Sequence, residues 1–453
     1  MPEVTPGPMP GTDATDLLQR LAEDIPRRGQ LAARMTFKRD LVARFGVEQA
    51  FAIAAPHLGV PRLQTLHRRR VRPLIDAARQ DAVTCRDLWH GGQVQEVPPM
   101  RVVGEGRQGP VKIGSRSMYL ACLEDVLLRG RSDLLIRKGE ALVDLEGAPF
   151  APATANAEFD PGVLHAEADH LWTMEPDGPV PRLKEALMLT GARTLDFGHW
   201  LIEYLPKLAI ARLAGWQGGM PVLVDRTTPD NVRHALQAML PPDAPLHTVG
   251  HLAPIRVDRL WCMPDTFLVG FYPSRTGNGQ LPQRLALEHW RAVSDEIFAM
   301  GGAAAAAPTG IDRLYLARRP ERKKKLVNHA EIEALVSRLG FTLIYPEDHS
   351  LIEQIRFVRH ARHIVAPEGS NAALAIFCSP GTRMCTLTSP DVQLLAIGNA
   401  IFDALGCQAT LFTGPMATDS PSYSTEWMFS FWNDYRIDAA ALEAFLTGWL
   451  AGA

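Results

Sequence analysis

Hydrophobic and polar positions change their spacing along the chain. Near the N-terminus the segments "TDLLQRLAEDI", "FKRDLVARFGVEQAFAIAAPHL" and "RVRPLIDAARQDAV" have apolar residues at helical spacing. They follow a Pro- and Gly-rich start at 1–14, and from about 95 to 150 the pattern becomes short alternating strands broken by glycine. The sequence therefore predicts a disordered tip and a helical extension over 1–94, followed by a β-rich entry to a second unit.

Strand and helix patterns alternate through the rest of the chain. Between about 185 and 300, the strand candidates "TLDFG", "MPVLVD" and "RVDRLWCMP" alternate with the helix candidates "HWLIEYLPKLAIARLAG" and "DNVRHALQAML". The linker-like "MGGAAAAAPTG" follows, and the alternation then restarts and continues to "TRMCTLT". Such alternation predicts βαβ units and mostly parallel sheets.

These patterns predict an α/β protein with two Rossmann-like domains that face a cleft, where a ligand would bind. The expected units are an N-terminal α/β domain at 95–299, a linker at 300–310 and a C-terminal α/β domain at 311–430. A final helix at 431–453 would cross back to the first domain or make a dimer contact.

Composition narrows the class of protein. Hydrophobic residues make up 46% and charged residues 21%, as in a soluble globular enzyme, and the net charge of -3 argues against a protein that coats nucleic acid. Six scattered cysteines form no CxxC pair, which predicts reduced thiols. No signal peptide and no run of about 18 apolar residues are present, so we expect a cytoplasmic protein without a transmembrane segment.

The stretch "IVAPEGSNAALAIF" at 364–377 predicts a strand, a turn and a helix. Unpaired N–H groups and the positive dipole end at such a helix start suit a phosphate, and Gly369, Ser370 and Asn371 would surround it. Glu368 would repel a phosphate, so we expect its carboxylate to contact sugar or ribose hydroxyls instead.

The segment "YLARRPERKKKLVN" places Arg318 at the carboxyl end of a strand, with Arg322 beyond it. Ligands bind at this end of an open α/β sheet, and arginine suits bidentate phosphate contacts. Arg318 and Arg322 are therefore candidate phosphate ligands, with a solvated basic loop as the alternative.

The segment "DFGHWLIEYLPKL" opens a helix with His199 and Trp200. His199 and Glu203 are four residues apart and share a helix face, so Glu203 can orient His199 as a general base. The alternative is a structural histidine at a helix end, stacked on the tryptophan.

Three further segments carry weaker signals. "SLIE" fits a capping box made by Ser350 and Glu353, although Glu353 could instead reach a ribose. The loop "GFYPSRTGNGQ" offers Arg275 and Asn278 to an acceptor. The two histidines of "LHAEADH" have a spacing that fits neither a helix face nor a strand face, so no metal site is predicted.

In their order, these motifs resemble glycosyltransferase family 61, which includes bacterial capsular-polysaccharide transferases. The positions that fit the family's pattern are His199, Trp200, Leu205, Pro206, Tyr315, Arg318, Arg322, Asn328, Pro346, Glu347, Glu353 and Gln354. His329 replaces a Glu of the pattern. Many members have a His-Gly-Ala turn followed by an Asn in the helix, whereas Glu368, Gly369 and Ser370 form the turn here and Leu374 takes the Asn position.

The resemblance implies the two-domain GT-B fold and inverting transfer from a nucleotide sugar, with no obligatory metal and no further cofactor. The donor, expected to be UDP-linked, would contact Arg318, Arg322, Asn328, Glu353, Gly369, Ser370 and Asn371. The acceptor, a glycan or lipid-linked glycan, would contact Trp200, Glu203, Arg275 and Asn278. The two candidate bases are His199 and Glu368, and we favour His199 because a histidine needs little pKa adjustment near neutral pH.

The expected role is capsular or other cell-surface polysaccharide synthesis, in the cytoplasm or peripherally at the inner face of the membrane. One alternative is a catalytically inactive, nucleotide-sugar-binding subunit of a polysaccharide assembly complex, which the lost His and Asn would support. In that case the N-terminal helices would bind the partner. A second alternative is a nucleotide-sugar epimerase on the same fold.

Overall fold

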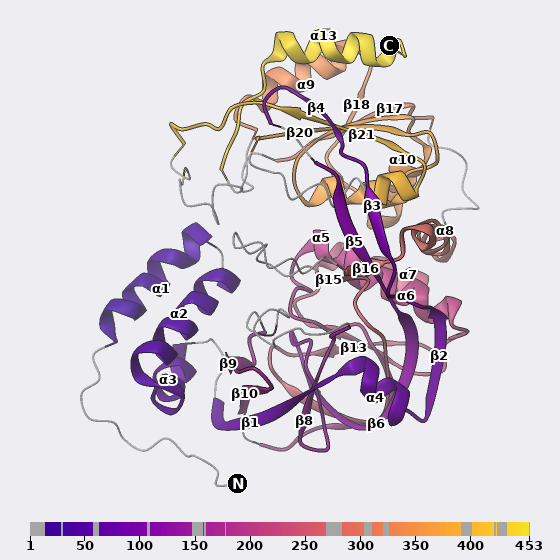
Figure 1. Ribbon diagram of the computed structural model, residues 1–453. Helices are drawn as coiled ribbons and strands as arrows, with labels where there is room; N and C mark the ends of the chain where they lie inside the picture. Colours follow the sequence, from indigo (N-terminus) through magenta and orange to yellow (C-terminus); the bar gives the residue numbers. More distant parts are fainter. Residues whose placement is uncertain are drawn as a thin grey trace.

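The computed structural model is a mixed α/β protein, which confirms the predicted class (Figure 1). The structure describes residues 14–28, 30–57, 63–106, 109–146, 157, 160–176, 178–268, 283–302, 310–319, 326–390, 401–420, 423 and 433–452. Residues 1–13 of the predicted disordered tip, most of the predicted linker, Arg275, Asn278 and Arg322 lie outside these residues.

A large mixed sheet fills the lower half of Figure 1. In spatial order its described strands are β13 (Leu246–Val249), β12 (Val222–Asp225), β11 (Arg182–Met188), β14 (Pro254–Cys262), β6 (Met118–Arg129), β7 (Leu135–Arg137), β8 (Glu140–Val143), β1 (Leu63–Pro73), β10 (His170–Pro176) and β9 (Val163–Ala166), with β2 (Thr84–Trp89) paired to β6. The first four strands are parallel. Because β11 lies between β12 and β14, the strand order reverses beside β11, and such a point is where α/β sheets bind ligands.

A smaller sheet lies in the upper half of Figure 1, and its described strands are all parallel. Its order is β18 (Thr342–Ile344), β17 (Arg313–Leu316), β19 (His363–Pro367), β20 (Arg383–Thr388), β21 (Gln408–Thr413) and β4 (Arg101–Val103). The switch point of this sheet lies between β17 and β19. Strand β19 is apolar and buried along most of its length, as expected for a parallel strand covered on both faces.

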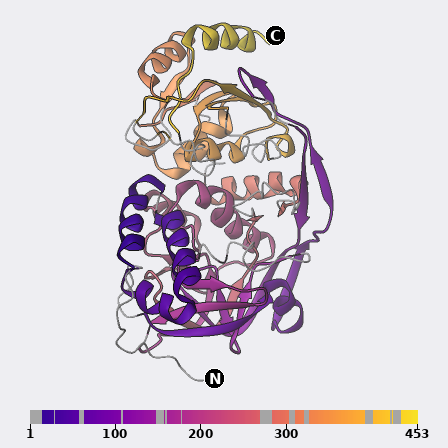
Figure 2. The ribbon, with the colours of Figure 1, turned by 60° about the vertical axis from the view of Figure 1, so that its left-hand side comes forward.

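Helices cover both sheets, and a short third sheet lies between them. The helices are α6 (Leu205–Leu213), α7 (Asp230–Met239), α8 (Trp290–Met300), α9 (His329–Arg338), α10 (Leu351–His360) and α13 (Ala439–Leu450). The third sheet contains β15 (Phe267–Leu268), β16 (Gln283–Leu285), β5 (Val111–Arg116) and β3 (Val94–Val97). In Figure 2 part of this β-structure runs up one side of the molecule, from the large sheet to the smaller one. The predicted domain limits remain predictions.

The predicted helical extension is partly wrong. Helices α1 (Thr15–Arg28), α2 (Gln30–Phe45) and α3 (Val47–Ala54) form, but β1 and β2 replace helix over much of 63–90. Strand β1 pairs with both β8 and β10, and this pairing overrides the helical spacing of its leucines. Helix α4 (Leu74–Gln80) forms after Pro73, which ends the strand.

One further strand prediction fails, and one of the two alternatives for the final helix is excluded. The segment "TLDFG" is a turn and helix start, because the strand ends earlier at Met188 and the Thr194 hydroxyl donates to Asp225 Oδ2 at 2.5 Å. The final helix α13 does not cross back to the first unit. Its Leu442 and Trp449 pack in the apolar core of the smaller sheet instead.

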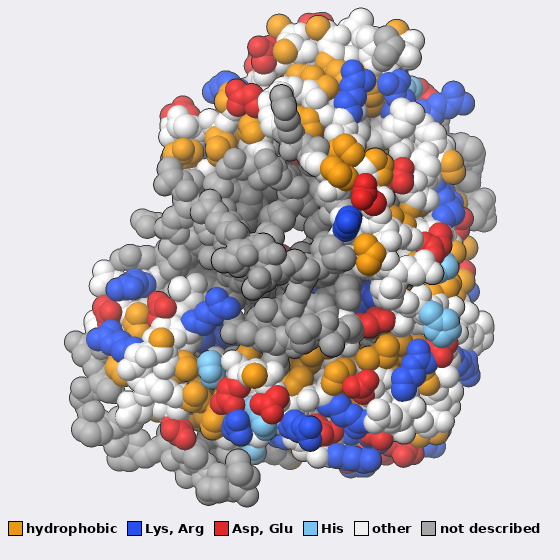
Figure 3. Space-filling view, in the orientation of Figure 1, with side chains coloured by type: hydrophobic (Ala, Val, Ile, Leu, Met, Phe, Trp, Pro, Cys, Tyr) orange, Lys and Arg blue, Asp and Glu red, His pale blue; other side chains and the backbone are white. Residues whose placement is uncertain are grey.

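Acidic and basic side chains are interspersed among the described residues on the face drawn in Figure 3, so neither sign of charge forms a continuous patch there. All six cysteines are unbridged, as predicted. In the described parts of the chain, no helix combines the length and the apolar character needed to cross a membrane.

Candidate active site

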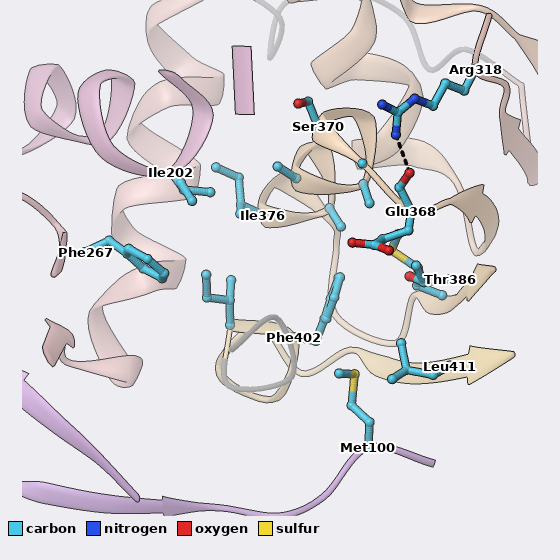
Figure 4. A pocket seen from close by; sticks show the side chains of 16 residues that line it. Met100, Ile202, Phe267, Arg318, Glu368, Ser370, Ile376, Thr386, Phe402 and Leu411 are labelled. Carbon is cyan, nitrogen blue, oxygen red and sulfur yellow. Dashed lines mark hydrogen bonds between the residues drawn. The ribbon is translucent and has the colours of Figure 1, made fainter. Parts of the chain in front are cut away.

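A cavity of about 310 Å³ opens at the carboxyl edge of the smaller sheet (Figure 4). Ile202 and Phe267 reach it from the large-sheet half, and the other lining residues include Met100, Arg318, Glu368, Gly369, Ser370, Ile376, Met384, Thr386, Phe402 and Leu411. The lining is mainly apolar with a few polar groups at one end. That combination and this volume are typical of a small-molecule site.

Gly369 allows Arg318 to approach the turn after β19. Its φ of 143° is one that residues with a side chain rarely adopt, and a Cβ there would lie 1.8 Å from Arg318 Nη1. Arg318 Nη1 donates to the Glu368 carbonyl at 2.5 Å. The end of strand β17 and the turn after β19 are therefore joined at the switch point of the sheet.

Glu368 is only 4% exposed, and its carboxylate faces the cavity. Thr388 Oγ1 donates to Glu368 Oε2 at 2.8 Å. The Glu368 backbone N–H donates to Tyr435 Oη at 3.2 Å, and Tyr435 Oη donates to the Leu387 carbonyl at 2.7 Å. Burial, with the nearby Glu368 charge, raises the pKa of Tyr435 and keeps it a hydrogen-bond donor.

The sequence did not single out Thr388 or Tyr435. Thr388 lies on strand β20 two residues after the cavity residue Thr386, so period-two alternation places both threonines on one face and offered a signal. Tyr435 reaches Glu368 from far along the chain, and no local pattern indicates that contact.

The predicted strand, turn and helix are present, although the helix η8 (Ser370–Phe377) is a 3-10 helix. Ser370 lines the cavity. Asn371 Nδ2 instead donates to the Ala317 carbonyl at 3.1 Å, which links η8 to the end of β17.

His199 ends helix α5 (Phe197–His199), which continues into one π-helical turn, η4 (Trp200–Tyr204), and then α6. His199 Nδ1 is 2.8 Å from Glu203 Oε1, with His199 24% exposed and Glu203 fully buried. A carboxylate only accepts hydrogen bonds, so Nδ1 carries the proton and Nε2 is left to accept one from a ligand. The predicted pairing of His199 with Glu203 is present.

Arg193 completes this arrangement from the turn after β11, and sequence reasoning missed it. Its Nε lies 3.3 Å from Glu203 Oε2. Burial alone would lower the pKa of Arg193, but the Glu203 charge raises it. Trp200 is fully buried and donates from its indole N–H to the Thr194 carbonyl at 2.7 Å, so its side chain has no surface towards a ligand.

The two walls meet beside the cavity. A Cβ on Gly198 would lie 3.3 Å from Ser370 Oγ, so the residue before His199 packs directly against the start of η8. His199 is not a cavity-lining residue; it lies next to the rim.

Asn328 and Glu353 lie outside the cavity. Asn328 exchanges hydrogen bonds with the backbone of Ile437, at 2.8 and 3.2 Å. Glu353 forms the predicted capping box, since its Oε2 accepts from the Ser350 N–H at 2.9 Å. Their predicted donor contacts, like all the ligand contacts, remain predictions.

Metal ligands do not gather in the described chain, where no group of three or more His, Cys, Asp or Glu side chains could hold an ion. The expectation that no metal or further cofactor is needed stays a prediction.

Fold and cavity together define an α/β protein with a ligand-sized site at the switch point of a parallel sheet, bounded on the other side by Ile202 and Phe267. Residues 197–385 match the model of glycosyltransferase family 61. The chain thus contains a glycosyltransferase 61 domain, which confirms the resemblance and implies glycosyltransferase activity with a sugar donor and an acceptor. A comparison with curated proteins found no match.

Proposed function

We propose that the protein is an inverting glycosyltransferase of GT-B architecture that transfers a sugar from a nucleoside-diphosphate sugar to a glycan acceptor. The family resemblance points to capsular or other cell-surface polysaccharide synthesis, on the cytoplasmic side of the membrane. A UDP-linked donor remains our expectation.

The proposal rests chiefly on one observation: the oriented His199–Glu203 pair lies beside the cavity that contains Arg318 and the Glu368–Gly369 turn. The pair lies on the helical segment that follows β11, the cavity groups follow strands of the smaller sheet, and the two parts meet where Gly198 contacts Ser370. Inverting transfer requires a base on one side of the anomeric carbon and positive groups near the leaving diphosphate on the other. The two walls offer one of each.

In this mechanism the oxygen of the acceptor hydroxyl attacks the anomeric carbon of the donor sugar, and His199 Nε2 takes the proton from that hydroxyl. The bond to the nucleoside diphosphate breaks, and Arg318 with the backbone N–H groups of 369–371 stabilises the departing negative charge. Glu368 accepts hydrogen bonds from hydroxyls of the donor sugar or ribose. Glu203 stabilises the imidazolium that His199 becomes.

A panel of nucleotide sugars tests the proposal, first by thermal shift and then by acceptor-dependent release of nucleotide. NMR of the product should show inverted anomeric configuration. We expect His199→Ala and Glu368→Gln to abolish transfer with the fold intact, and His57→Ala, at an exposed helix end, to have no effect.

Each other outcome contradicts a defined part of the proposal. Binding without nucleotide release indicates an assembly subunit, whereas release without an acceptor indicates an epimerase. If no nucleotide sugar binds, the proposed function is wrong. Retained configuration at the anomeric carbon would refute the inverting mechanism alone.

A further inference from the structure

Two arginines and a histidine gather where the N-terminal helices meet the large sheet. Arg34 comes from α2, Arg131 follows β6, and His251 follows β13. Burial lowers the pKa of Arg34, and the charge of Arg131 lowers it further. Burial, with Arg131 and Arg34, lowers the pKa of His251 to about 4. The three groups therefore lie within electrostatic reach of one another.

Backbone contacts fix two of these residues. Gly130 and His251 form a β-bridge, Leu252 N donates to the Gly130 carbonyl at 2.9 Å, and Gly130 N donates to the Ala253 carbonyl at 3.2 Å. Arg131 and Leu252 have φ of 55° and 51°, in the left-handed region that costs most side-chain-bearing residues energy. Strain of this kind is kept where the surroundings hold it, often at binding sites.

The helical extension is attached at the same place. Leu252 is fully buried in an apolar cluster with Leu41 of α2 and Phe51 of α3. Lys38, one helical turn after Arg34, donates to the Val163 carbonyl at 2.5 Å and to the Asp160 carbonyl at 3.1 Å. Residues four apart share a helix face, so Arg34 lies on the side of α2 that faces the sheet.

One described carboxylate lies beside the cluster: burial raises the pKa of Asp225 to about 6, against the lowering effect of the Arg131 charge. Both ring nitrogens of His251 and the Nε atoms of Arg34 and Arg131 are buried without a hydrogen-bond partner among the described residues, and none of the three side chains forms an ion pair with a described acid. Asp225 Oδ1 accepts from the Arg131 backbone N–H at 2.5 Å. Its Oδ2 accepts from Gly191 N at 3.0 Å and from the Thr194 hydroxyl.

Buried polar atoms without partners are costly, and two arginines beside one carboxylate leave a net positive charge, so a bound anion would satisfy both. We propose that Arg34, Arg131 and His251 form a subsite for an anionic group, a phosphate or a carboxylate, carried by the acceptor. The assignment to the acceptor rests on the proposed function; the anion site itself does not. Arg34 and Arg131 lie outside the matched residues 197–385, so the subsite adds to the family domain.

The position suits an acceptor that also reaches His199. His251 follows β13, and the turn that leads to His199 follows β11, two strands away in the same parallel sheet. Neighbouring strands lie about 4.8 Å apart, so the ends of β13 and β11 are separated by roughly 10 Å across the sheet edge. An oligosaccharide with an acidic group can span that distance.

Inorganic phosphate titrated into the full-length chain tests the site, with the NMR resonance of His251 as a local reporter. The spectrum of His251→Gln identifies this resonance. Bound phosphate is expected to raise the pKa of His251 from about 4 towards its ordinary value of 6.5, because the anion favours the charged ring.

Two variants remove one cation each. Arg34→Gln and Arg131→Asn should each weaken phosphate binding by roughly tenfold, the loss of about one charge-assisted contact. Asparagine tolerates the left-handed backbone at 131, which protects the fold. Arg338→Gln, which removes an exposed arginine paired with Glu443, is the matched control and should bind phosphate normally.

Phosphate binding that is unchanged in both variants would overturn the site, and so would a His251 resonance that neither phosphate nor acetate shifts. A sugar phosphate and a uronic acid then compete for the site, and the tighter competitor identifies the acceptor group. If nucleotide sugars fail to bind while the His251 shift is present, the proposed function is wrong and the anion site stands. Transfer rates to acidic and neutral acceptors are then compared in wild type and in Arg34→Gln. If neither protein transfers faster to acidic acceptors than to neutral ones, and both use neutral acceptors equally well, the assignment to the acceptor is wrong.

Discussion

Glu203→Gln is the sharpest test of how the large-sheet wall works. Glu203 is fully buried between His199 Nδ1 at 2.8 Å and Arg193 Nε at 3.3 Å. Glutamine keeps the size of the side chain and can still accept a hydrogen bond from His199, but it removes the negative charge. The substitution therefore isolates the electrostatic contribution of Glu203 to a base that becomes positively charged during transfer.

The expected effect can be worked from the geometry. Opposite unit charges about 4 Å apart attract by roughly 4 kcal/mol at an effective dielectric constant of about 20. Partial exposure of His199 and the remaining amide dipole reduce this to about 2–3 kcal/mol, which corresponds to roughly a 30- to 150-fold lower kcat/KM. Without the carboxylate the protonated form of His199 is less stable. The acidic limb of the plot of kcat/KM against pH should therefore change.

The assay is acceptor-dependent nucleotide release, measured as kcat/KM against pH for Glu203→Gln, His199→Gln and the double variant. If Glu203 acts through His199, adding Glu203→Gln to His199→Gln causes no further loss. Glu296→Gln, which likewise removes a carboxylate paired with an arginine, is the control and should retain full activity. Full activity in a folded Glu203→Gln protein, or additive losses in the double variant, would refute the reasoning.

Three other substitutions probe separate features. Gly369→Ala places a Cβ 1.8 Å from Arg318 Nη1 and forces a rare backbone angle, which should cost about 1–3 kcal/mol of stability. Thermal denaturation and nucleotide-sugar titration should show loss of both stability and binding. Gly381→Ala, with open space around it, is the control and should keep binding. Glu353→Ala removes half of the capping box and should cost about 1 kcal/mol with nucleotide-sugar affinity unchanged, and weaker binding would instead show that Glu353 reaches the donor. His251 has a folded-state pKa of about 4 against an ordinary 6.5, so between these values the unfolded chain binds a proton that the folded chain does not. The free energy of unfolding therefore rises with pH across that window. Calorimetry in phosphate-free buffer should show this slope flattened in His251→Gln.

Local patterns predicted four strands of the smaller sheet, β17, β18, β19 and β20, because each is a short run rich in apolar residues between turn or capping residues, but they did not place β21 or β4 in it. The capping box at Ser350, the turn at Gly369 and the pairing of His199 with Glu203 all depend on residues at most four positions apart. The segment at 63–73 failed for the opposite reason. Its neighbours β8 and β10 come from distant parts of the chain, and their pairing decided its conformation.

The same distinction explains which parts of the candidate site were missed. Arg193 contacts Glu203 from an irregular turn, and Tyr435 contacts Glu368 from 67 residues away, so neither has a periodic signal. The cluster of Arg34, Arg131 and His251 depends on three separate segments whose meeting is fixed by tertiary packing. Sequence spacing can indicate a side chain's face, but it cannot indicate what lies opposite.

The surroundings of Glu368 bear on the choice between the two candidate bases. Thr388 holds one of its carboxylate oxygens, and Tyr435 and Leu387 hold its backbone, so the side chain is fixed at the cavity wall. A fixed carboxylate is well suited to accept hydrogen bonds from ligand hydroxyls. His199, oriented by Glu203 through Nδ1, instead has its second ring nitrogen available for a proton. The residue that departs from the family pattern at 368 therefore suits substrate binding, and this favours His199 as the base without requiring that activity was lost.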